Sequence, residues 1–582
     1  MLPAAVPEPP PAVIADAYPG KARYAPGEPV SISIELVAPP AGAYAEADIL
    51  ALDRIVGACR PNTTTLPPTT RLTLSCTLPS TDFQGYLVTV RLRDADGRTL
   101  DTRLTAIDVS SDWARFPRYA YLAWFSHSSS DDPLGWVDQL NRFHIDGLQF
   151  YDFQYRHERP LAGPVSAPAS RWIEISGREV DADILQQFLD QAHRRNMIAM
   201  AYDASYAAYG DALSGPGGLP LAWATWPTRD TPRTAATVKS FDLDNPGWST
   251  QRLLYMNQND PAWRRYIFAR MADLMQVYPF DGWHIDTYGA LGAYAFDGSR
   301  VDFVAGFRSF ADEARVALGK RVLLNTVNGY GQDDIARSSA DFVYSELWGG
   351  HETFASILAT ADEVHRANPD KALVLAAYLH RHGPRDGPNP TGMFNPPAVL
   401  LADAAIFASG ASHIELGDGD RMASSEYWPD DMRLRMSPEL HEALRHYYDY
   451  LTAYEVYLGY ADPIDFPVKV PGYRIDGSGS PGSIWSIARQ RGDITLLHLI
   501  NLLHSVDGRW RDIRRTAQVP PFLRDLVVEI PRCDGVTAAG WASPDIDGGL
   551  YHPLPLKSGA QAGSCTVVLP SLSYWSTIFL RR

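Results

Sequence analysis

YPFDGWHIDTYGA (278–290) is a run of apolar and aromatic residues that ends in an acid, Asp286, followed by a small polar turn. The apolar part has the length and composition of a buried strand. A buried carboxylate without a partner is costly, so Asp286 must be neutralised, paired or used in chemistry. The stretch therefore predicts a buried strand whose last residue is a paired or a functional acid.

Seven more strand-like runs lie between residues 118 and 418, and amphipathic helical segments such as 181–196 and 261–278 separate them. Many of these runs are continuously apolar, as is typical of parallel strands covered on both faces. Eight strands with helical crossovers predict a central (β/α)8 TIM barrel over residues 113–455. An open doubly wound sheet is the alternative, although no GxGxxG motif follows a strand. The predicted strands are 118–126, 146–153, 196–204, 280–289, 321–329, 341–349, 372–380 and 412–418.

The two ends of the chain have a different pattern, with short runs that alternate polar and apolar residues between turns. VSISIEL (30–36) is an example near the start, and ITLLHLINLL (494–503) is a strand-like run near the end. Residues 1–112 are therefore predicted to form an N-terminal immunoglobulin-like β-sandwich. Residues 456–582 are predicted to form a C-terminal antiparallel β-sandwich. The predicted fold class is a multidomain chain with two β-sandwiches flanking a barrel.

The composition limits the partners that this chain can have. Its net charge is −16, and a surface of that sign repels nucleic acid and anionic membranes while permitting a neutral substrate. No apolar run reaches the roughly 18 residues needed to span a bilayer. The N-terminal stretch MLPAAVPEPPPAV lacks the basic and apolar regions of a signal peptide. We expect no nucleic-acid partner, no membrane span and a monomer.

The four cysteines fall into two pairs, each within one predicted domain: Cys59 with Cys76, and Cys533 with Cys565. This distribution suits two disulfides formed in an oxidising compartment. Four unrelated buried thiols are the alternative. The disulfide interpretation predicts a secreted or periplasmic protein whose signal peptide has been removed, whereas free thiols would suit a cytoplasmic one.

Polar and aromatic side chains end nearly every predicted barrel strand, and active sites of such barrels lie at the C-terminal ends of the strands. One carboxylate at a strand end is usually a loop cap, but five or more at one mouth predict a site. Some of the candidates are expected only to cap loops or to support other residues. The predicted substrate-binding residues are Asp152, Tyr155, His157, Asp203, Asn328, Trp348, Tyr378 and Glu415.

Several kinds of chemistry find no support in the sequence. No GxSxG nucleophile elbow ends a strand, and there is no HExxH motif. His157, His284 and His380 follow no known metal-ligand spacing, and the acidic loop 417–426 lacks the spacing of an EF-hand. We expect no metal and no cofactor. Paired carboxylates with nearby aromatic residues remain as candidates. Glycoside hydrolases use a pair of carboxyl groups to cleave the glycosidic bond, so this class is favoured.

The chain contains, in this order, the stretches YDFQYRHERPL (151–161), FDGWHIDTYG (280–289), NTVNGYG (325–331), DFVYSELWG (341–349), FNPPAVLLADAAIFASGASHIELGD (394–418) and EYWP (426–429). These and further stretches resemble glycoside hydrolase family 66, which comprises the dextranases and the cycloisomaltooligosaccharide glucanotransferases. The resemblance covers most of residues 115–460. It implies that Asp286 at the end of the fourth strand is the nucleophile and that Glu346 after the sixth is the general acid/base of a retaining mechanism.

The resemblance leaves two main activities open. Cyclising members of the family carry a large carbohydrate-binding module after the seventh strand, whereas here only residues 381–394 separate that strand from the next matching stretch. This difference favours an endo-dextranase that cleaves the α-1,6 linkages of dextran to isomaltooligosaccharides. The alternatives are a cycloisomaltooligosaccharide glucanotransferase and a hydrolase of another α-glucan, because DGWHIDTYG also resembles the nucleophile strand of the α-amylases. A non-enzymatic glucan-binding protein is the least favoured.

Overall fold

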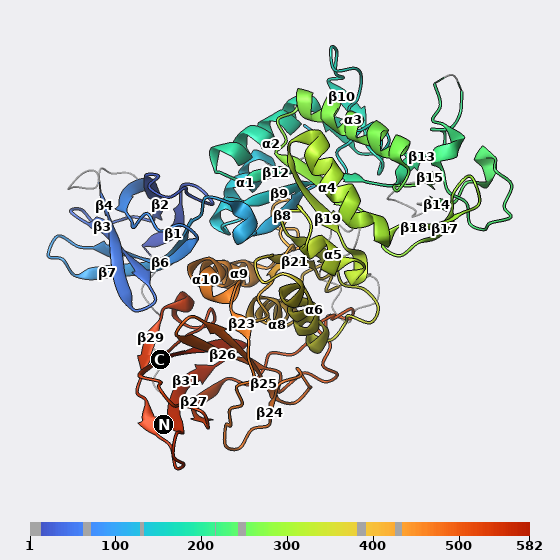
Figure 1. Cartoon of the computed structure of the whole chain (residues 1–582). Coiled ribbons are helices and arrows are strands. Elements are labelled where there is room, and N and C mark those ends of the chain that lie inside the picture. Colours follow the sequence, from blue (N-terminus) through green and yellow to red (C-terminus); the bar gives the residue numbers. More distant parts are fainter. Residues whose placement is uncertain are drawn as a thin grey trace.

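The structure is a computed structural model, and Figure 1 shows sheet-rich N- and C-terminal regions beside a central region of strands and helices. Residues of the segments 381–391 and 425–433, which include the stretch EYWP, lie outside the described residues. The residues that the structure describes are 13–61, 71–127, 133–215, 217–242, 252–380, 392–424 and 434–582.

Eight strands form the central sheet, and every neighbouring pair is parallel. All eight predicted strands are present, in chain order across the sheet. The Tyr121 N–H donates to the Leu416 carbonyl at 3.0 Å, which links the first strand to the segment directly after the last. The strands are β8 (Tyr119–Leu122), β9 (Gly147–Phe150), β12 (Ile198–Ala204), β16 (Gly282–Asp286), β19 (Arg321–Asn325), β20 (Val343–Glu346), β21 (Leu373–Ala376) and β22 (Ser412–His413).

Helices connect these strands, as the predicted crossovers require. The local signals are clear at α3, where the Asp260 carboxylate accepts the N–H groups of Ala262 and Trp263 and Pro261 occupies the first turn. The helices are α1 (Pro133–Arg142), α2 (Ala182–Arg194), α3 (Pro261–Val277), α4 (Phe307–Leu318), α5 (Gln332–Ala336), α6 (Phe354–Ala367), α8 (Pro396–Ala408), α9 (Pro438–Ala453) and α10 (Glu455–Leu458).

Alternate residues of the central strands face opposite sides of the sheet. Tyr119, Tyr202 and Tyr344 belong to one buried cluster, whereas Trp283 and Val343 belong to the cluster shared with the helices. His284 and Asp286 lie two residues apart on β16, so they share the face of the first cluster. This alternation decides which strand-end side chains can reach a common site.

The N-terminal region is a seven-stranded sheet whose neighbouring strands are all antiparallel. Its strands are hydrogen-bonded in one continuous series, so the description as an immunoglobulin-like sandwich stays a prediction. In sheet order they are β1 (Ile14–Pro19), β2 (Val30–Leu36), β5 (Arg71–Thr77), β4 (Arg54–Pro61), β3 (Tyr44–Ala51), β6 (Gln84–Arg93) and β7 (Thr99–Val109).

The C-terminal region has two sheets that share one hydrophobic core, to which Leu497, Val528 and Leu569 contribute. The first sheet contains β23 (Asp462–Pro463), β24 (Ile475–Asp476), β25 (Ile484–Arg491), β26 (Ile494–Asn501), β28 (Ala538–Ala542), β29 (His552–Leu554) and β32 (Trp575–Arg581). The second contains β27 (Leu523–Ile530), β30 (Lys557–Ser558) and β31 (Cys565–Leu572).

Smaller sheets lie in the connections of the central region. They are β10 (Arg171–Ile173) with β11 (Glu179–Asp181), β13 (Ala207–Tyr209) with β14 (Ser240–Asp242) and β15 (Arg252–Tyr255), and β17 (Gly292–Tyr294) with β18 (Arg300–Asp302). The β13–β15–β14 sheet matters for the site, because Phe241 and Leu253 reach the pocket described below.

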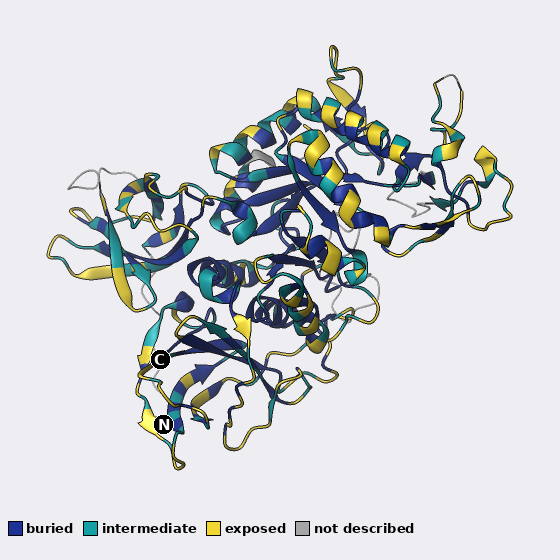
Figure 2. Ribbon diagram, in the orientation of Figure 1, coloured by how far each residue is buried: buried dark blue, intermediate teal, exposed yellow. Residues whose placement is uncertain are grey.

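Buried contacts join the three regions. Arg118, directly before β8, donates to Asp108 at 2.5 Å and to Glu455 of α10 at 2.7 Å, and all three side chains are buried. Helix α8 contacts both β22 and β26, and its residues 397–408 are buried all round, which Figure 2 shows as a dark helix. The predicted boundary at residues 455 and 456 falls inside α10, and the predicted domain limits remain predictions.

Both predicted disulfides are present, Cys59–Cys76 between β4 and β5 and Cys533–Cys565 at the start of β31. Among the residues that the structure describes, no helix is long and apolar enough to cross a membrane.

Removing the Cys533–Cys565 disulfide with paired Ser substitutions should destabilise the C-terminal sheets. The cross-link spans 32 residues, and loop-closure entropy then predicts a loss of about 3 to 4 kcal/mol. Scanning calorimetry should show a lower Tm for the transition of this region. The matched Cys59→Ser/Cys76→Ser variant removes a cross-link that spans 17 residues, so its free energy of unfolding should fall slightly less. Wild-type Tm values in both variants would contradict the prediction.

Candidate active site

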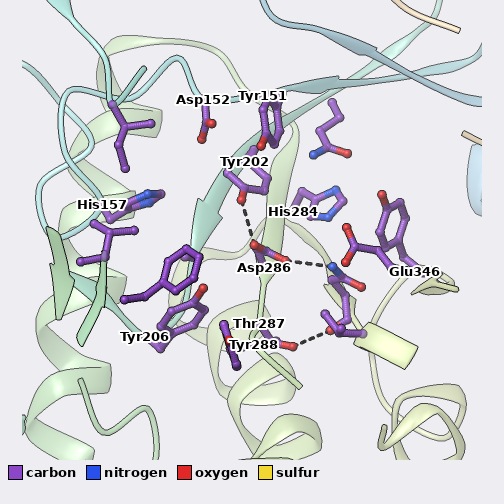
Figure 3. Close-up of a pocket in the computed structure, with 18 of the residues that line it drawn as sticks. Tyr151, Asp152, His157, Tyr202, Tyr206, His284, Asp286, Thr287, Tyr288 and Glu346 are labelled. Carbon is purple, nitrogen blue, oxygen red and sulfur yellow. Dashed lines mark hydrogen bonds between the residues drawn. The ribbon is translucent and has the colours of Figure 1, made fainter. Parts of the chain in front are cut away.

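A pocket of about 430 Å³ lies at the C-terminal ends of the central strands (Figure 3). Its lining comes from β9, β12, β16, β19, β20 and β21 and from the segments that follow them. Figure 3 shows Asp286 near the middle, Glu346 on one side of it, and Asp152 and His157 on the other. The structure therefore brings both predicted catalytic acids to one pocket.

Asp286 is the last residue of β16, as the sequence predicts, and its carboxylate accepts two side-chain hydrogen bonds. Tyr202 Oη donates to Oδ2 at 2.8 Å, and Asn325 Nδ2 donates to Oδ1 at 2.9 Å. Burial raises the pKa of Asp286, while these two donors and the Thr287 N–H lower it. The donors fix the carboxylate in position and favour its ionised form.

Glu346 is the last residue of β20, again as predicted. Tyr378 Oη donates to Oε1 at 2.8 Å, and Trp348 Nε1 donates to Oε2 at 3.1 Å. Burial and the nearby charge of Asp286 raise the pKa of Glu346 to about 7, against the effect of these donors. A carboxyl with that pKa still holds its proton in a large fraction of molecules at neutral pH.

Asn325 connects the two acids. Its amide donates to Asp286, and a hydrogen bond from the same side chain also lowers the pKa of Glu346. The charge of Asp286 disfavours ionisation of Glu346, so the two carboxyls titrate as a pair. Because the charge of Asp286 is itself a cause of the high pKa of Glu346, we assign the first ionisation to Asp286.

Four of the eight predicted substrate-binding residues line the pocket: Asp152, His157, Trp348 and Tyr378. Asp152 has a φ of 45°, a strained backbone for a non-glycine residue, and burial together with the charge of Glu174 raises its pKa to about 7. Trp348 packs against Tyr378 with ring centroids 5.3 Å apart, so two aromatic rings lie together beside Glu346.

Asp203 and Asn328 each form a hydrogen bond with a residue that lines the pocket. Asp203 Oδ1 lies 2.6 Å from His157 Nδ1, and although burial lowers the pKa of His157, this bond and this charge raise it above its usual value. Asn328 Oδ1 accepts the Trp348 N–H at 3.1 Å and so holds the loop after Glu346. Neither residue lines the pocket.

Tyr155 and Glu415 are not brought to the pocket. Glu415 is buried and faces the outer helices: its Oε1 accepts from Tyr448 of α9 at 3.1 Å, and Oε2 lies 3.5 Å from His413 Nδ1. Its neighbour Ile414 belongs instead to the cluster containing Tyr202 and Tyr344. The alternation of side chains in this segment therefore turns Glu415 away from the site.

Sequence reasoning did not assign the residues that fix Asp286, nor two tyrosines of the pocket lining. Tyr202 and Asn325 bond Asp286, while Tyr344 and Tyr151 line the pocket beside them. His284 pairs with Tyr119 Oη at 3.2 Å, and burial lowers its pKa to about 3, so it is neutral. The sequence contained a signal for two of these residues. Tyr344 and His284 lie two positions before Glu346 and Asp286, so strand alternation turns them to the same face as the acids.

An aromatic group lines the other part of the pocket. Tyr206, Phe241 and Tyr288 contribute to the lining, and the Tyr206 ring stacks on Tyr255 with centroids 5.2 Å apart. Tyr288 is 43% exposed and packs edge-on against Tyr255. Flat aromatic faces beside paired acids suit a sugar ring.

The three histidines considered for metal binding do not converge. His157 and His284 line the pocket, but His380 bonds the Asp512 carbonyl at 2.6 Å and accepts the Asn395 N–H at 3.1 Å. Among the described parts of the chain, the one group with metal-ligand proximity is Asp403, His413 and Glu415, behind β22. Neither Asp286 nor Glu346 belongs to this group.

The profile of glycosyl hydrolase family 66 matches residues 19–579. The chain belongs to glycosyl hydrolase family 66. This confirms the resemblance on which the roles of the two acids were predicted, and family 66 membership extends over both flanking regions as well as the central sheet.

Relatives and solved structures within the family carry two activities in their names. A cycloisomaltooligosaccharide glucanotransferase of Niallia circulans is 28% identical over 737 aligned positions, covering 100% of this chain and 74% of the relative. A dextranase of Streptococcus salivarius is 25% identical, covering 74% of this chain and 58% of the relative. The crystal structure of a Paenibacillus cycloisomaltooligosaccharide glucanotransferase with cycloisomaltoheptaose superposes with a TM-score of 0.87 at 25% identity, covering 98% of this chain and 99% of that chain.

The buried cluster around Glu415 predicts a pH-dependent stability. Burial raises the pKa of Asp403 to about 8, and burial with the charge of Asp403 raises that of Glu415. The folded protein then holds protons that the unfolded chain releases, so its stability falls as pH rises from about 4 to about 8. Asp403→Asn cannot ionise, and its Tm should fall less than that of the wild type between about pH 5 and about pH 8.

Differential scanning fluorimetry across this pH range measures the effect, with the exposed Asp534→Asn as the control. The control curve should parallel that of the wild type. Parallel wild-type and Asp403→Asn curves would refute the interpretation. A Tm that falls on adding a chelator would indicate a bound metal at these side chains instead.

Proposed function

We propose that this chain is an endo-acting retaining glycoside hydrolase that cleaves the α-1,6-glucosidic linkages of dextran to isomaltooligosaccharides. The observation that carries the proposal is the pair Asp286 and Glu346, held at the ends of β16 and β20 in one pocket with different surroundings. The substrate class rests on the names of the family 66 relatives, one a dextranase and others cycloisomaltooligosaccharide glucanotransferases.

In the first step the Asp286 carboxylate attacks the anomeric carbon of the bound glucan. The bond from that carbon to the glycosidic oxygen breaks, and the proton of Glu346 passes to the leaving oxygen. Tyr202 and Asn325 hold the nucleophile in place during the attack. The product is a glycosyl ester on Asp286.

In the second step Glu346 changes from acid to base. The charge of Asp286 is one cause of the high pKa of Glu346, and the ester has no such charge, so Glu346 now favours its ionised form. It takes a proton from water, whose oxygen attacks the anomeric carbon. The ester bond breaks, Asp286 regains its charge, and two inversions leave the configuration retained.

The scaffold that we propose is a closed (β/α)8 barrel flanked by two β-sandwiches. Eight parallel strands in chain order and the Tyr121–Leu416 hydrogen bond support closure. The two C-terminal sheets over one core support the second sandwich. A closed barrel explains why both acids, on strands four and six, face the same mouth.

The acceptor of the glycosyl group separates two candidate activities. The short connection 381–394 supports water as the acceptor and hence hydrolysis. Transfer to the glucan's own end, giving a cyclic product, is the second candidate, and the names of two curated relatives and one solved structure favour it. Both share the same first step on Asp286.

We also propose that the protein is secreted and acts as a monomer without cofactor. The two disulfides support an oxidising compartment.

Digestion of dextran beside soluble starch, with products resolved by size and ring closure, tests the proposed function. Linear isomaltooligosaccharides from dextran alone are expected. Cyclic products would replace hydrolysis by transglycosylation, and cleavage of starch alone would overturn the assigned linkage.

Asp286→Ala and Glu346→Ala should each lower kcat on dextran by several orders of magnitude without changing the Tm greatly. The first removes the nucleophile and the second the proton donor. Asp281→Asn is the matched control from the same stretch, because Asp281 does not line the pocket and its carboxylate bonds the Ala199 N–H and His193. Near-wild-type kcat in either alanine variant would refute the assignment.

Tyr378→Phe and Tyr202→Phe should move opposite limbs of the pH profile. Losing the bond from Tyr378 raises the pKa of Glu346, so the alkaline limb of kcat/KM shifts to higher pH. Losing the bond from Tyr202 raises the pKa of Asp286, so the acidic limb shifts upward. Each variant serves as the control for the other. If the alkaline limb does not move in Tyr378→Phe and the acidic limb does not move in Tyr202→Phe, the roles given to these bonds are wrong.

A further inference from the structure

A loop of the C-terminal region reaches the segment that carries Glu346. Residues 502–522 connect β26 to β27, and three of them contact the chain directly after β20. Trp510 Nε1 donates to the His351 carbonyl at 2.7 Å, and Arg509 and Arg511 both pair with Glu352, at 2.8 and 2.9 Å. The loop therefore packs onto the rim of the pocket although it lies outside the central sheet.

Arg511 is the centre of this contact. Its Nε donates to the Tyr378 carbonyl at 3.1 Å, its Nη2 donates to the Leu347 carbonyl, and its Nη1 pairs with Glu352. The side chain is only 3% exposed, and its guanidinium lies 5.6 Å from the Trp348 ring. The planar guanidinium of Arg511 thus hydrogen-bonds to two separate segments, the one after β20 and the one after β21.

These segments hold two hydrogen-bond donors of Glu346. Tyr378 donates to one carboxyl oxygen and Trp348 to the other, and Leu347 is the residue directly after Glu346. Arg511 bonds a carbonyl of each segment, that of Leu347 and that of Tyr378. The position of Glu346 then depends on a residue more than a hundred positions away in the sequence.

We propose that Arg511 is a positioning residue for the general acid, and that the C-terminal region completes the active site through it. The proposal rests on the proposed function for the role of Glu346. It goes beyond that function by giving the C-terminal region a part in the reaction. Lysine cannot replace Arg511, because a single ammonium lacks the planar fork that reaches three acceptors.

Arg511→Lys tests the proposal, with Arg509→Lys as the matched control. Arg509 lies on the same loop and pairs with the same Glu352, but its side chain is 53% exposed. On dextran, Arg511→Lys should lower kcat by about 10- to 100-fold, with KM changed far less, because a small misplacement of the acid affects the reaction more than binding. Arg509→Lys should behave like the wild type.

The pH profile distinguishes positioning from a merely structural role. Misplaced Tyr378 and Trp348 favour the charged form of Glu346 less, so the alkaline limb of Arg511→Lys should shift upward by about half a unit or more. Loss of stability alone would lower the Tm and leave the limb in place. Guanidinium added in the millimolar range to Arg511→Ala should restore part of kcat.

The pKa of Glu346 can also be measured without turnover, from infrared difference spectra of each protein against its Glu346→Gln counterpart. A raised pKa in Arg511→Lys but not in Arg509→Lys supports positioning even if dextran proves to be the wrong substrate. Equal pKa values and equal kcat in the two lysine variants would overturn the proposal.

Discussion

The site depends on the repulsion between two carboxyls that share one pocket. We assign the first ionisation to Asp286, because its charge is one cause of the high pKa of Glu346, and Tyr202, Asn325 and the Thr287 N–H favour its charged form. That charge, together with burial, keeps the proton on Glu346. Two acids with nearly the same intrinsic pKa thus differ in how readily they ionise because of their surroundings alone. The difference disappears when the charge of Asp286 is removed, which is what a covalent step at that residue would do.

The rest of the fold holds Asp286 and Glu346 in position relative to each other. Parallel strands place the last residues of β16 and β20 at the same edge of the sheet, and side-chain alternation turns both acids to the same face. Asn325 of β19, the strand between them, bonds Asp286 and favours the charged form of Glu346. Outside the sheet, the 502–522 loop fastens the segments that donate to Glu346, and α8 packs between β22 and β26. The C-terminal region is thereby joined to the site at its rim and along a buried helix.

The sequence predicted the parts that depend on local pattern. Apolar runs with a terminal acid located Asp286 and Glu346 at strand ends, and apolar runs also predicted the eight strands. The placement of two cysteines in each end region favoured the two disulfides over four free thiols. Glu415 was placed in the site because it also follows a strand. However, β22 has only two residues, so its alternation could not be read, and the side chain faces α8 and α9.

Contacts between distant segments could not be predicted from a single sequence. Tyr202 meets Asp286 because β12 and β16 pair in a register that sets Tyr202 opposite His284. Arg511 meets Tyr378 only after the C-terminal sheets have docked. No local signal marks either residue, since a tyrosine in a strand and an arginine in a loop are both common in positions without such a role.

The most direct test of the double-displacement account is the anomeric configuration of the first product. Proton NMR during the early digestion of dextran, before mutarotation, resolves the α- and β-anomers of the new reducing end. The account predicts that the α-anomer forms first, because two inversions at Asp286 restore the configuration. An initial β-anomer would mean a single displacement by water, and Asp286 would then not be the nucleophile.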